Sequence, residues 1–263
     1  MRVRTYGTSG PQVVVIHGGP GAPGSVAPVA RGLAGSFRVL EPFQRGSGGE
    51  PLTVSRHVAD LHELIQSRCA GARPALVGHS WGAMLALACA AQHRQSAGPL
   101  VLIGCGTFDP LARAIFQAAI NSRMDERVRA RFDSLEEQFA DPDERLRAKA
   151  ELLLPLYSYD LISEDQEVEA CDARSQRESW DDMVRLQSEG VYPAAFSAIR
   201  SPVLMLHGGA DPHPGRMILA SLKPYLSEIE YREWERCGHY PWLEKAVRDE
   251  FFSVLRGWLL ASC

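Results

Sequence analysis

The sequence Gly78-His79-Ser80-Trp81-Gly82 joins two segments of different character. A short apolar run, Pro74-Ala75-Leu76-Val77, precedes it, and small apolar residues fill positions 83–91 after it. The first run is typical of a buried strand and the second of a buried helix. A sharp strand-to-helix turn strains its central residue and leaves no room for side chains two positions away on either side. Both of those positions are glycine, so we expect Ser80 to project clear of a sheet as an exposed nucleophile.

Two later segments supply the partners that such a serine needs. A serine hydroxyl is a poor nucleophile at neutral pH without an adjacent base. Asp211 follows a strand-like run, Val203–His207, by way of two glycines, and His239 follows a second strand-like run over 229–234. The carboxyl ends of parallel strands meet at one edge of a sheet, where sites form. We therefore expect Ser80, His239 as base and Asp211 as its orienting acid to meet there.

A glycine-rich loop completes the expected site. His17-Gly18-Gly19-Pro20-Gly21 follows a buried-type strand over 12–16. A tetrahedral intermediate needs two backbone N–H donors for its oxyanion. The residue after the nucleophile, Trp81, supplies one, and Gly19 is our choice for the other. Asp109, which follows the strand-like run 100–103, is the competing candidate for the acid.

Each candidate also has a purely structural interpretation. Ser80 could be an ordinary helix N-cap, Asp211 a turn residue and His239 a surface histidine. His207 ends a strand near Asp211 and is interpreted as a packed residue behind the site. The remaining histidines are expected to be structural or to have no catalytic role: His17, His57, His62, His79, His93 and His213.

Composition bounds the class of protein. The 263 residues are 45% hydrophobic and 23% charged, which suits one large domain with a substantial core. A net charge of −4 and a pI near 6.1 argue against nucleic-acid binding. No apolar stretch approaches the roughly 20 residues that span a bilayer, and residues 1–5 are not those of an export signal. We expect a cytoplasmic protein without membrane association.

Cysteine usage adds little chemistry. None of the six cysteines forms a C-x-x-C pair, and none has the spacing of a zinc site. We therefore predict reduced, mostly buried thiols, no metal and no cofactor. The oligomeric state is left open.

The middle of the chain differs from its two ends. Short β-rich runs alternate with helical stretches up to about residue 106 and again from residue 200, which predicts a mostly parallel sheet covered by helices on both faces. Residues 107–199 lack β-branched runs and look helical, with helices expected over 126–139 and 144–154. We predict a core of residues 1–106 and 200–263 with an inserted helical cap at 107–199. An amphipathic helix over 242–260 is expected to close the fold.

The predicted cap is acidic. It holds 20 acidic and 11 basic side chains, a net charge of −9. This charge suits a cationic substrate, but it is also typical of a solvated helical surface. No motif selects a substrate-binding carboxylate, and the candidates include Glu164, Asp165, Glu167 and Glu169.

Together these motifs resemble the α/β-hydrolase superfamily, whose members carry serine, aspartate and histidine in this chain order. Within it, His17-Gly18-Gly19-Pro20-Gly21, Gln44-Arg45-Gly46 and the Ser80 pentapeptide are similar to the proline iminopeptidase branch. That resemblance implies a Ser80–His239–Asp211 triad, an oxyanion hole at Gly19 and Trp81, and cap carboxylates that grip a free amine. Phe43 and His79 depart from the branch, which usually has aspartate and glycine there.

The sequence thus favours a metal-independent serine hydrolase acting through an acyl-enzyme. Its substrate would be a small molecule or a short peptide, either a peptide N-terminus as in the iminopeptidases or an ester as in the carboxylesterases. Enzymes that hydrolyse C–C bonds and cofactor-free haloperoxidases use the same residues. A different class, a ligand-binding receptor that keeps the hydrolase shell, remains as an alternative.

Overall fold

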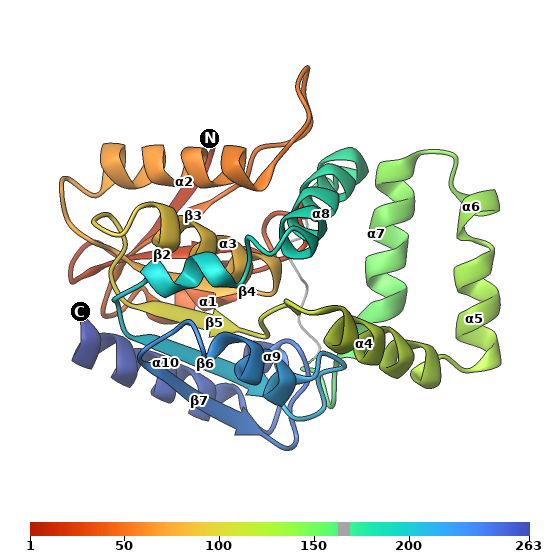
Figure 1. Ribbon diagram of the computed structural model, residues 1–263. Coiled ribbons are helices and arrows are strands. Elements are labelled where there is room, and N and C mark those ends of the chain that lie inside the picture. The colour runs from red at the N-terminus through yellow and green to blue at the C-terminus, as the bar shows by residue number, and fades with distance from the viewer. Residues whose placement is uncertain (163–168) are drawn as a thin grey trace.

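The computed structural model describes residues 1–162 and 169–263 (Figure 1). Glu164, Asp165 and Glu167 lie outside the described residues. The described chain forms one seven-stranded sheet in the order β1-β3-β2-β4-β5-β6-β7. The predicted mostly parallel sheet is confirmed, because every neighbouring pair except β1 and β3 is parallel. The strands are β1 (Val3–Tyr6), β2 (Gln12–Ile16), β3 (Arg38–Pro42), β4 (Ala75–His79), β5 (Leu100–Ile103), β6 (Val203–Gly208) and β7 (Ile229–Trp234).

Strand β1 was not anticipated. It runs antiparallel to β3 at the edge of the sheet, with Arg4 opposite Glu41. Its four residues, Val3-Arg4-Thr5-Tyr6, include one charged side chain, and none of them is fully buried. A strand so short and polar carries little hydrophobic signal.

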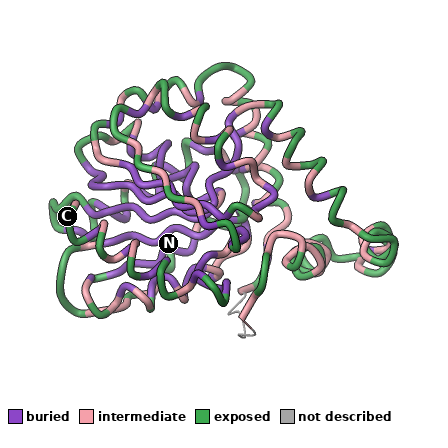
Figure 2. Tube along the Cα trace, turned by 90° about the horizontal axis from the view of Figure 1, so that it is seen from below, coloured by how far each residue is buried: buried purple, intermediate pink, exposed green. Residues whose placement is uncertain are grey.

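Two hydrophobic layers flank the sheet. Alternate residues of β2 face opposite sides: Val14 and Ile16 pack in one cluster, Val13 and Val15 in the other. The first cluster joins the sheet to helices α2 (Val54–Arg68), α3 (Trp81–Gln92) and α9 (Gly215–Leu222). The second joins it to α1 (Ala27–Leu33) and α10 (Arg248–Ser262). Figure 2 shows the buried strands at the centre of this body.

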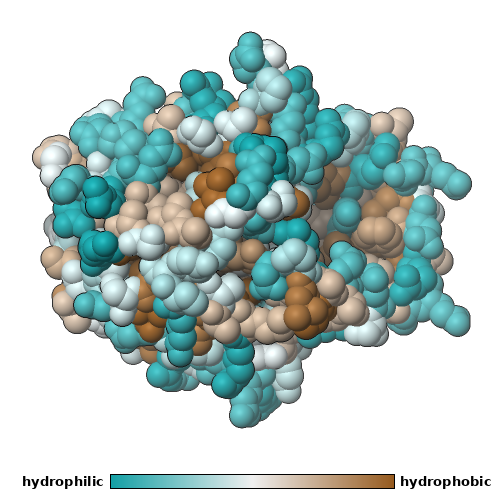
Figure 3. Space-filling model, in the orientation of Figure 1, coloured by the Kyte–Doolittle hydropathy of each residue, from teal (hydrophilic) through white to brown (hydrophobic). Residues whose placement is uncertain are grey.

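The described residues between β5 and β6 are helical. Figure 1 shows α5, α6 and α7 projecting to one side of the body, whereas α8 lies beside α2. Figure 3 shows apolar surface between the body and the projecting helices, whose outer rim is hydrophilic. The exact cap boundaries, 107 and 199, stay a prediction. The helices are α4 (Pro110–Arg123), α5 (Glu126–Asp133), α6 (Leu135–Gln138), α7 (Pro142–Leu153), η1 (Leu154–Tyr157), α8 (Ala173–Ser188) and η2 (Ala194–Ala198).

Two predicted helices have different bounds in the structure. The expected helix over 126–139 is divided into α5 and α6 at Ser134. The expected C-terminal helix over 242–260 begins only at Arg248, after a short 3₁₀ turn, η3 (Pro241–Leu243). Residues 243–245 instead bond to residues 160–162, so their backbone groups are committed to that contact. None of the helices among the described residues is long and apolar enough to cross a membrane.

Candidate active site

Ser80 occupies the turn between β4 and α3 in a strained backbone conformation. Its φ of 53° and ψ of −117° lie in a region that non-glycine residues rarely adopt and that costs on the order of 1–3 kcal/mol. Ser80 stands at the N-cap position, yet its side chain makes no capping hydrogen bond. The interpretation of Ser80 as an ordinary N-cap therefore lacks the contact that defines one, and its hydroxyl is left for another partner.

The flanking glycines are required for two different reasons. A Cβ on Gly78 would come within 3.0 Å of the Gly82 carbonyl oxygen, as the expected clash across the turn demands. A Cβ on Gly82 would instead meet the carbonyl oxygens of Ile16 and His17 on the neighbouring strand. The turn can thus press against β2, which brings Ser80 close to the glycine loop.

His239 and Asp211 lie in direct contact. The Nδ1–H of His239 donates a hydrogen bond of 2.6 Å to Oδ2 of Asp211, and both side chains are almost completely buried. The competing acid, Asp109, does different work: its Oδ1 accepts the N–H of Ala112 at 2.8 Å and caps α4. Asp211 is therefore the acid that the structure pairs with His239.

The turn that carries Ser80 lies against the loop that carries His239. Its N–H donates to the Ile103 carbonyl at 2.8 Å, and the adjacent Gly104 packs so closely on His239 that a Cβ there would lie 2.9 Å from Nδ1. His79 donates from Nε2 to the His239 carbonyl at 3.1 Å, and the two rings lie 4.6 Å apart. These contacts hold the serine turn and the histidine loop against each other.

Asp211 is surrounded by three histidines. Nδ1 of His213 donates to Oδ1 of Asp211 at 2.8 Å, and Nε2 of His207 lies 3.6 Å from Oδ2. Burial by itself raises the pKa of this carboxyl, but the charges of His239, His213 and His207 hold it well below its usual range. Asp211 is thus an ionised acid. His213 was expected to have no catalytic role, and the structure adds a contact that was not anticipated: the turn Asp211-Pro212-His213 folds the histidine back onto the aspartate.

The histidine loop is held by Glu244, which sequence reasoning also missed. This buried carboxylate accepts the N–H groups of Gly238 at 2.8 Å, Tyr159 at 2.9 Å and Asp160 at 2.7 Å. His239, which follows Gly238 in the chain, donates its own N–H to the Tyr157 carbonyl at 2.7 Å. The loop is therefore fastened to residues 157–160, at and just after the end of η1 in the middle of the insertion. A lone glutamate six residues from a glycine gives no sequence signal of this contact.

Gln44 connects the glycine loop to the serine turn. Its amide donates to the His17 carbonyl at 2.9 Å and its oxygen accepts the Trp81 indole N–H at 2.8 Å. Gly19 has a φ of 47°, in the left-handed region that glycine adopts without strain. Among the described turns and caps, the amides of Gly19 and Trp81 donate to no backbone carbonyl. That Gly19 and Trp81 form an oxyanion hole is compatible with these contacts of the described residues and stays a prediction.

His17 is structural, as expected. It donates from Nδ1 to the Gly18 carbonyl at 2.8 Å and accepts the Gln44 N–H at Nε2. Burial lowers the pKa of this imidazole to about 4, so it stays neutral and fixes the loop.

Aromatic side chains from the insertion close over the histidines. Phe116 of α4 stacks on His213 with ring centroids 4.2 Å apart and planes 13° apart. Tyr157 of η1 lies 5.4 Å from the His239 ring and 5.9 Å from His213. The space beside His239 is therefore bounded by apolar ring surface.

The half-buried acids of the insertion have partners elsewhere. Within residues 107–162 and 169–199, each half-buried acid accepts a hydrogen bond or pairs with a basic side chain, and the other acids are exposed. Three of the half-buried acids lie at the start of α8 or on it: Asp172, its N-cap residue, accepts the N–H of Ser47, and Glu178 and Asp182 accept those of Leu52 and Val54. The other two are Glu169, which pairs with Arg2 and Arg4, and Asp109.

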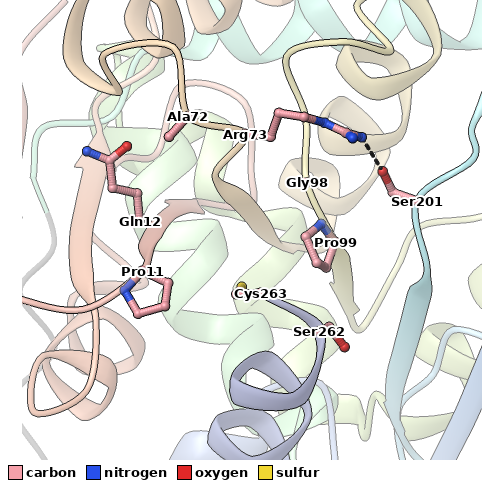
Figure 4. Close-up of a pocket in the computed structure, with 9 residues that line it drawn as sticks. All are labelled: Pro11, Gln12, Ala72, Arg73, Gly98, Pro99, Ser201, Ser262 and Cys263. Carbon is pink, nitrogen blue, oxygen red and sulfur yellow. Dashed lines mark hydrogen bonds between the residues drawn. The ribbon is translucent and has the colours of Figure 1, made fainter.

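Two further features were considered as sites: a group of possible metal ligands and a cavity away from Ser80. Asp211, His213 and His239 have ligand atoms within 4.8 Å of one another, but their hydrogen bonds account for this grouping. A cavity of about 390 Å³ lies at the opposite edge of the sheet, where β2 begins and where the chain enters β4, β5 and β6 (Figure 4). There Arg73 already donates to Ala97 and Ser201. The cavity is lined by Pro11, Gln12, Ala72, Arg73, Gly98, Pro99, Ser201, Ser262 and Cys263.

A match to a protein-family model shows the family of this chain. The family model described as "Alpha/beta hydrolase family" matches residues 13–252. The chain belongs to the alpha/beta hydrolase family. This alpha/beta hydrolase resembles solved structures across almost its whole length, although at sequence identities that show the fold alone. A comparison with curated proteins gave no significant match.

Three of these structures illustrate the likeness. A putative lipase from Acinetobacter baumannii AYE is 22% identical, with a TM-score of 0.68, covering 99% of this chain and 87% of the lipase. An esterase from Thermogutta terrifontis is 20% identical (TM-score 0.66; 99% and 93% covered). The enol-lactonase from Burkholderia xenovorans LB400 is 21% identical (TM-score 0.61; 98% and 96% covered). The proline iminopeptidase branch is not specifically supported by these matches.

Proposed function

We propose that this alpha/beta hydrolase is a serine hydrolase that cleaves small, uncharged carboxylic esters through an acyl-enzyme. The observation that carries the proposal is the 2.6 Å hydrogen bond between His239 and a buried, ionised Asp211, held against the strained turn of Ser80. Strained residues with unused hydroxyls beside such a pair are typical of nucleophiles.

In the proposed reaction the Ser80 oxygen attacks the ester carbonyl while Nε2 of His239 takes the hydroxyl proton. Asp211 keeps the Nδ1–H tautomer and stabilises the imidazolium that forms. The N–H groups of Gly19 and Trp81 stabilise the tetrahedral oxyanion. The imidazolium returns the proton to the leaving alcohol. A water molecule, deprotonated by His239, then releases the acid and restores Ser80.

The surroundings of the site favour an ester over a peptide N-terminus. A free α-amine needs an unoccupied carboxylate, whereas the half-buried acids of the insertion in the described residues already have partners. Phe116 and Tyr157 instead offer ring surface to an apolar acyl or alcohol group. The esterase hypothesis therefore ranks ahead of the iminopeptidase hypothesis.

A matched pair of substrates tests this choice. We expect N-acetyl-proline aryl ester to be cleaved with kcat/KM at least equal to that of the proline aryl ester with a free amine. The two esters share their proline ring and leaving group, and acetylation replaces the cationic amine with a neutral, bulkier amide. A charge-assisted hydrogen bond to a cap carboxylate would favour the free amine by at least about tenfold, roughly 1.4 kcal/mol. Such a preference in steady-state assays would restore the iminopeptidase hypothesis.

The pH profile tests the base. Burial lowers the pKa of His239 from its ordinary 6.5, and the adjacent Asp211 offsets only part of this. The base is active when neutral, that is, above its pKa. We expect kcat/KM to rise with pH to a plateau and to reach half of that plateau below pH 6.5. A profile that reaches half of its plateau only above pH 7 would contradict a buried His239 as the base.

A further inference from the structure

His213 contacts both members of the acid–base pair without belonging to the proposed triad. Its Nδ1–H donates to Oδ1 of Asp211 at 2.8 Å, and its backbone N–H donates to the same oxygen at 2.9 Å. Its ring lies nearly parallel to that of His239, with centroids 4.7 Å and planes 23° apart. The His213 carbonyl accepts a hydrogen bond from Nε2 of His207 at 3.0 Å, and this bond holds the turn of residues 211–213 in place.

The two oxygens of Asp211 therefore have separate tasks. Oδ2 accepts the His239 Nδ1–H, and Oδ1 accepts both donors of His213. The last torsion of an aspartate side chain is broad, so a carboxylate bonded through one oxygen can rotate about its Cβ–Cγ bond. Donors on the second oxygen restrict that rotation. The plane of the carboxylate, and with it the orientation of His239, thus depends on His213.

The far face of the His213 ring meets the helical insertion. Phe116 of α4 stacks on it with ring centroids 4.2 Å apart. The rings of Phe116, His213 and His239 therefore form a stack with His213 in the middle. This contact keeps the imidazole in the rotamer that reaches Asp211. The insertion is in this way connected to the acid of the site by one side chain.

We propose that His213 is a positioning residue that orients Asp211 toward His239 through its side-chain hydrogen bond to Oδ1. This inference rests on the proposed function for its catalytic consequence. The orientation itself is a property of the resting protein. His213 acts through Asp211, so its loss lowers turnover and leaves substrate binding nearly unchanged.

Two substitutions separate the hydrogen bond from the ring. His213→Asn keeps an N–H donor close to the position of Nδ1 and removes the stacked ring, whereas His213→Phe keeps a stacked ring and removes the donor. We expect His213→Phe to lower kcat by about tenfold or more, the effect of losing one hydrogen bond to a charged group. KM is expected to change by less than about twofold, since uniform binding is untouched. His213→Asn is expected to retain most of the wild-type kcat. His62→Phe, on α2, is the matched control.

A spectroscopic measurement tests the orientation without any turnover. A proton in a short imidazole–carboxylate hydrogen bond resonates at low field in the proton NMR spectrum. In Ser80→Ala protein we expect this His239 resonance to persist with His213→Asn and to shift or broaden with His213→Phe. An unchanged resonance with His213→Phe would overturn the inference, as would equal loss of kcat in both variants. If wild-type protein fails to cleave esters, the proposed function fails, and the NMR comparison still decides the role of His213.

Discussion

Ser80→Ala is expected to lower kcat by a factor on the order of 10⁵–10⁶, as loss of the nucleophile does in serine hydrolases. The substitution removes one oxygen that makes no capping bond, so the free energy of unfolding should change by less than about 1 kcal/mol. Steady-state turnover of the best ester and thermal unfolding of the same preparation give the two values. Turnover near the wild-type rate would remove Ser80 from the mechanism.

Ser67→Ala is the matched control for that substitution. The Ser67 hydroxyl donates to carbonyls of its own helix, α2, on the exposed side of the molecule. We expect this variant to keep the wild-type kcat. An equal loss in both variants would indicate damage to the fold instead of removal of a nucleophile.

Asp211→Asn is expected to reduce kcat by about 10⁴, because an amide in place of the carboxylate favours the wrong tautomer of His239. KM should change far less. Asp109→Asn is the informative comparison, since asparagine caps helices about as well as aspartate and α4 should remain intact. Steady-state kinetics of both proteins distinguish the two acids. An inactive Asp109→Asn protein beside an active Asp211→Asn protein would show that the acid is misassigned.

The contact between Asp211 and His239 and the turn that carries Ser80 could be predicted from the sequence because the preceding strands belong to one parallel sheet. Each of the three residues follows the end of a parallel strand, and such ends share one edge. The local signals are also strong: glycines flank the serine, and two glycines precede the aspartate. A single sequence is enough to predict features that depend on local backbone geometry and on the pattern of hydrophobic residues.

The roles of His213 and Glu244 could not be predicted in this way. His213 acts through a tight turn that folds it back on Asp211, and a histidine two residues from an aspartate is common in loops. Glu244 collects N–H groups from residues 159 and 160, more than 80 positions away. Buried polar contacts of this kind depend on tertiary packing.

The acidic character of residues 107–199 was ambiguous for the same reason. Its net charge of −9 suited either a cationic substrate or a solvated surface. In the structure, the N-cap residue of α8 and two acids on that helix accept backbone N–H groups from residues 47, 52 and 54, which lie 125 to 128 positions away in the chain. These carboxylates fasten the insertion to the body, a use that neither expectation included.

Labelling with a fluorophosphonate tests the central claim most directly. This reagent phosphonylates a serine only when a base and an oxyanion hole activate the hydroxyl. We expect one label per folded protein, located at Ser80 by mass spectrometry of the peptides, and loss of the label in both Ser80→Ala and His239→Ala. Folded wild-type protein that takes up no label would contradict the claim and would favour a ligand-binding role for the same fold.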